Sequence, residues 1–137
     1  MNKNILLLKN NVTDLTTLNA GIISAQQQCA TIGLTVNFTQ VNSSFQFSSV
    51  GLNTDVVTGG YCVNPPEIFQ QAKTFGIPFD VALLVYDWTK IKPQPTNPSD
   101  AGQDISIPEQ WYATFPNVFA QFFLHELCHY FFSYYGL

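Results

Sequence analysis

The residues best suited to chemistry stand together near the end of the sequence, as His125-Glu126-Leu127-Cys128-His129. Helical residues four apart are rotated by only about 40°, so His125 and His129 would project from one face and could reach one metal ion. Glu126 would lie about 100° from His125, within reach of a water held by that metal. Two imidazole ligands and a carboxylate that accepts a proton from water are what a zinc hydrolase needs.

The rest of the composition strengthens this interpretation of the motif. Both histidines of the chain lie in it, and Glu126 is one of only three glutamates. Two histidines and a glutamate among phenylalanines would be costly to bury without partners. We therefore favour metal binding over a purely structural role for these side chains.

The motif needs a helix to position it, and its surroundings predict one over about 117–135. Thr114 or Asn117, around Pro116, could open this helix, and Gly136 could end it. A helical context is the one in which the motif acts as a metal site.

The N-terminal third predicts a strand, a helix and a second strand. Residues 4–8 form an apolar run, and residues 34–41 alternate between apolar and polar types. Between them, Thr13 or Asp14 could cap a helix that Gly33 ends. One face of that helix is apolar at helical spacing, through Leu15, Leu18, Ile22, Ala25 and Cys29.

The remaining segments complete an α+β (mixed α/β) domain. We expect a helix from Pro66 to about Phe75, a central strand at 81–86 and an edge strand at 104–107 that ends at Pro108. The glycines and prolines of 51–66 and 93–102 indicate loops. Residues 1–137 are thus predicted to form one domain, with a twisted mixed sheet backed by helices and a C-terminal active-site helix.

Composition excludes some classes of partner. The chain has a net charge of −4 and no arginine, which argues against nucleic acid. No segment resembles a signal peptide or a membrane span, and the compartment stays open. The three cysteines are an odd number without a pairing pattern, and within the motif helix we expect Cys128 to be a small buried thiol.

The stretch Phe122-Phe123-Leu124-His125-Glu126-Leu127-Cys128-His129-Tyr130-Phe131 resembles the extended zincin consensus, with uncharged flanking and internal positions and no proline. The layout before it resembles the N-terminal zincin subdomain, in which a twisted sheet is backed by one helix and underlain by the active-site helix. The resemblance implies a metallopeptidase in which His125 and His129 bind Zn2+ and Glu126 is the general base. It also implies a peptide or protein substrate along an exposed edge strand, for which our candidate is Ile105, Ser106 and Ile107.

The third zinc ligand is not evident from the motif. The metzincin extension would place glycine at 132 and histidine at 135, where Phe132 and Tyr135 stand. We favour a ligand in a continuation of the chain, so that the domain lacks its C-terminal subdomain. The alternatives are an upstream carboxylate, such as Asp87, Asp104 or Glu109, or a degenerate site that binds metal weakly.

Two functions follow from these alternatives. The first is zinc-dependent hydrolysis of peptide bonds, with Glu126 activating a zinc-bound water. The second is a catalytically inactive zincin-like binding or structural module in a larger assembly, with a protein partner docked on the aromatic C-terminal helix.

Overall fold

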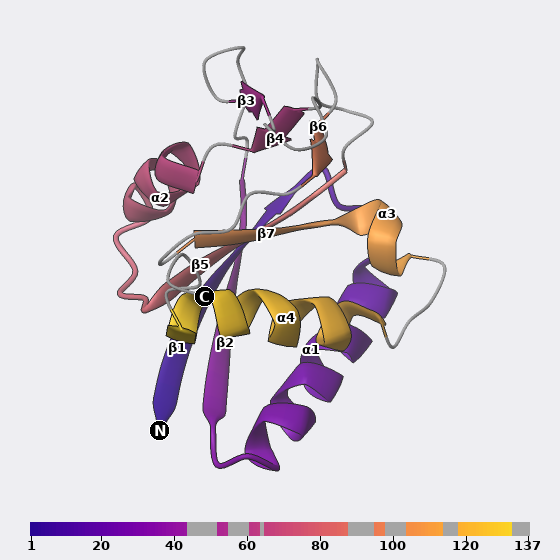
Figure 1. Cartoon of the computed structure of the whole chain (residues 1–137), viewed down its shortest axis with the longest axis vertical. Coiled ribbons are helices and arrows are strands. Elements are labelled where there is room, and N and C mark those ends of the chain that lie inside the picture. The colour runs from indigo at the N-terminus through magenta and orange to yellow at the C-terminus, as the bar shows by residue number, and fades with distance from the viewer. Residues whose placement is uncertain are drawn as a thin grey trace.

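The computed structural model describes residues 1–43, 52–54, 61–63, 65–87, 95–97, 104–113 and 118–132. Helices and strands alternate along much of the chain, which confirms the predicted α+β (mixed α/β) class (Figure 1). The elements follow in the order β1 (Asn2–Asn10), α1 (Leu15–Ala30), β2 (Thr35–Asn42), β3 (Leu52–Thr54), β4 (Tyr61–Val63), α2 (Pro65–Lys73), β5 (Val81–Tyr86), β6 (Pro95–Asn97), β7 (Asp104–Pro108), α3 (Glu109–Tyr112) and α4 (Val118–Phe132).

A four-stranded parallel sheet with the strand order β2-β1-β5-β7 forms the centre of the fold. Parallel neighbours need long crossover connections, and α1 makes such a crossover between β1 and β2. Every residue of β5 is buried, as expected of a central strand. The mixture of parallel and antiparallel pairs that we expected in the sheet occurs instead in a smaller sheet, β3-β4-β6.

The strands of the smaller sheet lie in segments that we predicted to be loops, so that part of the prediction was wrong. Each of these strands is only three residues long. β3 and β4 are close in the sequence, but β4 pairs with β6 from a distant segment, with Tyr61 opposite Pro95. Glycine and proline around the three strands also make such short extended pieces hard to recognise. Pro95 opens β6, which stands at the end of this sheet, where a missing N–H is tolerated.

Alternate residues of β1 point to opposite faces of the larger sheet, as strand geometry requires. Ile5 and Leu7 contribute to a core cluster with α1 and α4, whereas Leu6 and Leu8 pack in a second cluster with α2. The helices α1 and α4 therefore cover one face together, and α2 covers the other (Figure 1).

No helix in the described part of the chain is long and apolar enough to cross a membrane.

Both predicted ends of α1 are confirmed. The Asp14 side chain caps the first turn by accepting a hydrogen bond from the Thr17 N–H at 3.0 Å. Gly33, with φ of 77°, ends the helix in a Schellman motif. The Leu34 N–H donates to the Cys29 carbonyl at 3.0 Å, and the Gly33 N–H donates to the Ala30 carbonyl at 3.1 Å.

We expect Asp14→Ala to lower the free energy of unfolding at neutral pH but much less in acid. Hydrogen bonds from the Thr17 hydroxyl and then from the Thr17 N–H hold the pKa of Asp14 below its ordinary value of 3.8. A native pKa below the unfolded one gives stability that is present above the unfolded pKa and is lost as the pH falls through the native pKa. Urea unfolding across this range measures the effect. Asp14→Asn, an equally good cap, should keep a free energy of unfolding close to that of the natural protein at neutral pH. A pH-independent loss in Asp14→Ala would contradict the assignment.

Candidate metal centre

The helix α4 carries the His-Glu-x-x-His motif and lies within the range predicted for it. It runs back across the sheet after β7 and α3, with α1 beside it (Figure 1). The predicted helix starts and the stop at Gly136 fall at 114–117 and 133–137, which lie outside the described residues. Its buried face packs against α1 and β7. The apolar residues of this face are Phe119, Ala120, Phe123 and Leu127.

Gly21 of α1 allows α4 to approach closely. A Cβ atom at this position would lie 2.6 Å from the Phe119 Cβ and 2.9 Å from its Cγ. Real Cβ atoms do not come this close, so any side chain at position 21 would have to displace α4. A glycine inside an apolar helical pattern is the sequence signal for such a contact, and our sequence analysis did not use it.

Aromatic rings fix Phe119 and its neighbours in place. The Phe119 ring meets Tyr112 of α3 edge to face, with centroids 5.3 Å apart, and stacks near Phe123 at 6.4 Å. Phe123 in turn lies 5.1 Å from Phe38 of β2. These contacts tie the motif helix to α3 and to the sheet, and therefore fix which face of α4 is turned outward.

The side chains of His125 and Glu126 face opposite environments. His125 is exposed, whereas Glu126 is only 3% exposed and lies on the core side of α4. The rotation of about 100° between consecutive helical residues accounts for this difference. The imidazole is therefore on the solvent side, and the carboxylate is at the border of the apolar core beside it.

His129 belongs to α4 one turn after His125, at the spacing that the motif requires. Its side chain lies outside the described part of the structure. An imidazole at an exposed position, with a second histidine one turn further, is a donor set that suits zinc. Among the side chains that the structure describes, no three histidine, cysteine, aspartate or glutamate residues gather at one point.

Glu109, one of the carboxylates considered for the third ligand, has a structural role at the start of α1. Its Oε2 accepts hydrogen bonds from the backbone N–H groups of Thr13 at 2.9 Å and Asp14 at 3.0 Å. Its Oε1 accepts from the Thr13 hydroxyl at 3.3 Å. The residue is buried and thereby joins α3 to the N-terminus of α1, where a negative charge is favourable.

We expect Glu109→Gln to lower the free energy of unfolding by about 1–2 kcal/mol, because a neutral amide replaces a charged acceptor of buried hydrogen bonds. Chemical denaturation measures the change. Glu67→Gln, which removes the same charge from α2, is the control. If zinc affinity fell while stability did not, Glu109 would be a ligand and not a tie between helices.

The other two carboxylates are placed differently. Asp87 follows β5 and accepts a hydrogen bond from the Gln110 side chain, next to Glu109 on α3. Asp104 begins β7 and is paired in register with Ala82, while its side chain lies outside the description.

The candidate substrate strand, residues 105–107, lies in β7. This strand ends the order β2-β1-β5-β7 and pairs with β5 on one side. Ile107 is fully buried and points into the core cluster shared with α1 and α4, whereas the side chains of Ile105 and Ser106 are not described. Because α4 packs against β7, the motif helix and this strand are neighbours.

Cys128 is exposed, so our expectation of a buried thiol was wrong. It lies three residues after His125, on the same outer side of α4, because the helix packs through Phe123 and Leu127. Cys29, by contrast, is fully buried in α1, and burial raises the pKa of its thiol.

These two thiols should therefore react at very different rates. In the variant Cys62→Ser, we expect a thiol reagent to label Cys128 quickly and Cys29 only after unfolding, because the reactive thiolate is accessible only at the first site. Mass spectrometry of the labelled peptides measures both rates, and Cys128→Ser is the control. Fast labelling of Cys29 in the folded protein would contradict the packing of α1.

Comparison with known proteins gives no relative from which a role for these residues could be transferred. No protein-family profile, no curated protein and no solved structure matches the chain. The functional interpretation therefore depends on the motif and on its setting in the fold.

Proposed function

We propose that this protein hydrolyses peptide bonds with a zinc ion held by His125 and His129 and with Glu126 as the general base. The observation that carries the proposal is the setting of the motif on α4. One predicted ligand is turned to solvent, and the predicted base is turned to the protein side of the same helical turn. A bound zinc ion would supply the Lewis acidity that polarises the scissile carbonyl and acidifies the attacking water.

In this proposal Glu126 moves the proton. Its carboxylate would accept a proton from the attacking water and later deliver it to the leaving amine nitrogen. The surrounding helix face, with Phe123 and Leu127 buried beside it, holds Glu126 in a fixed position. Fixed positioning favours a general base, because proton transfer requires hydrogen-bond distance to the reacting group.

The edge of the larger sheet offers a place for the substrate. An extended peptide could add to β7, the last described strand of the sheet, through backbone hydrogen bonds. The packing of α4 against β7 supports this placement, because a peptide bound along the strand would lie near the motif.

Zinc titration of the purified chain, together with a peptidase assay on an unstructured protein substrate, tests the proposal. We expect binding of one zinc ion, lost in His129→Ala and kept in Gln121→Ala, which changes an exposed residue of the same helix. Tight binding would place the third ligand within this chain. Hydrolysis should depend on zinc and stop on chelation. Zinc binding without hydrolysis would favour the non-catalytic zincin-like module, and absence of binding would overturn the metal centre.

A further inference from the structure

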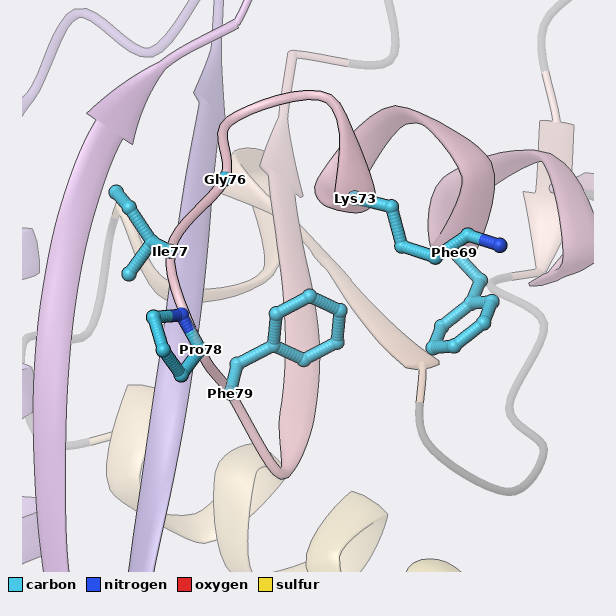
Figure 2. A pocket seen from close by; sticks show the side chains of 6 residues that line it. All are labelled: Phe69, Lys73, Gly76, Ile77, Pro78 and Phe79. Atoms are coloured by element: carbon cyan, nitrogen blue, oxygen red, sulfur yellow. The ribbon is translucent and has the colours of Figure 1, made fainter.

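An open pocket of about 430 Å³ lies on the face of the sheet opposite α4. It is bounded by α2 and by the segment that leads into β5, as Figure 2 shows. Its lining consists of Phe69, Lys73, Gly76, Ile77, Pro78 and Phe79. The volume falls in the range of small-molecule sites, about 300–1,000 Å³.

The apolar walls of this pocket are held by the core beneath them. The Phe69 and Phe79 rings meet nearly edge to face, with centroids 5.8 Å apart and planes at 78°. Ile77 and Phe79 both pack against the buried cluster that includes Leu6 and Leu84. The walls are therefore formed without a ligand, which lowers the cost of ordering them on binding.

Lys73 gives the pocket a positive charge. Its Nζ lies 5.0 Å from the centre of the Phe69 ring, and Figure 2 shows the side chain extending over that ring. None of the six lining residues is acidic. Asp80, which follows Phe79, accepts a hydrogen bond from the Asn4 N–H of β1 at 2.8 Å and is thus directed toward the sheet.

We infer that this pocket binds a small monocarboxylate with an aromatic body. A flat ring would complete the contacts offered by Phe69 and Phe79, since aromatic groups favour edge-to-face and offset packing. The carboxylate would lie beside the Lys73 ammonium, the only charge among the six described lining residues. The site is on the other face of the sheet from His125, so it neither requires nor excludes the proposed hydrolase.

Lys73 lies in the last turn of α2, where a positive charge also stabilises the helix through its dipole. A variant without this charge separates the helix-stabilising role from ligand binding. Lys73→Met keeps the aliphatic stem over Phe69 and removes only the charge. If Lys73 only stabilised the helix, Lys73→Met would change stability but would not change the preference between a charged ligand and its neutral analogue.

Titration of the full chain with 3-phenylpropionate and with its neutral amide, followed by ¹H–¹⁵N NMR, tests the inference. We expect shifts in residues of α2 and at 76–79, unchanged resonances in α4, and binding of the acid about two- to fivefold tighter than that of the amide. Lys73→Met should abolish this preference, and Phe69→Ala should weaken both ligands. The absence of shifts at these residues, equal binding of acid and amide, or a preference that survives in Lys73→Met would overturn it.

Discussion

Glu126→Gln is expected to lower the rate of the proposed zinc-dependent peptide hydrolysis by about 10²–10⁴-fold, the usual contribution of a general base. The amide has nearly the shape of the carboxylate but cannot accept the proton from water. Because Glu126 is 3% exposed and sits on the packed face of α4, a residue of the same size should leave the helix in place. Zinc affinity should stay unchanged, since the predicted ligands are the two histidines.

The measurement is kcat/KM on a fluorogenic peptide at saturating zinc, beside a zinc titration of the same preparation. His125→Ala is the informative comparison, because it should lose both zinc and activity. Retained activity in Glu126→Gln would rule out the general-base role. Lost zinc in Glu126→Gln would instead make the carboxylate part of the metal site, and a thermal melt of the variant would reveal any loss caused by misfolding.

Local rules predicted much of the framework that positions the site. The cap at Asp14 and the stop at Gly33 depend only on neighbouring backbone groups, and both occur as expected. The strand β5 was predicted with its observed bounds, because an uninterrupted apolar run is typical of a strand covered on both faces.

The faces of α4 were harder to predict. The helix is apolar on nearly every side, so helical periodicity could not show which side is buried. Packing through Phe119, Phe123 and Leu127 places Cys128 on the outer side, against our expectation, and His125 with it. The orientation is set by contacts with α1 and the sheet, which are distant in the sequence.

Two residues that position the site were missed for the same reason. The carboxylate of Glu109 bonds to Thr13 and Asp14, more than ninety residues away. Gly21 contacts Phe119 across a helix–helix interface. Neither partner can be deduced from local pattern, because each contact joins α1 to a helix that follows β7, about a hundred residues later in the chain.

Gly21→Ala is therefore expected to destabilise the protein, although alanine favours helices over glycine by about 1 kcal/mol. The new methyl group would lie 2.6 Å from the Phe119 Cβ, which is not the mobile end of a side chain. Tyr112 and Phe123 flank that ring, so it has little room to turn away. Overpacking of this kind costs about 1–3 kcal/mol. Gln27→Ala, on the exposed side of α1, gains a smaller amount of helix propensity without the clash and should be neutral or slightly stabilising.

The same variant distinguishes where a third ligand of the proposed zinc site would lie. Relief of the clash would move α4 relative to α1 and the sheet, but His125 and His129 would move together because they share one helix. If all protein ligands come from α4, Gly21→Ala should lower the unfolding free energy in denaturant titrations and leave the zinc affinity of the folded protein unchanged. If a ligand comes from another element, both quantities should fall together. Replacing glycine by alanine stabilises a helix where no other element packs against that position. Such an increase in stability in Gly21→Ala would show that α1 and α4 do not approach as closely as the Gly21–Phe119 contact requires.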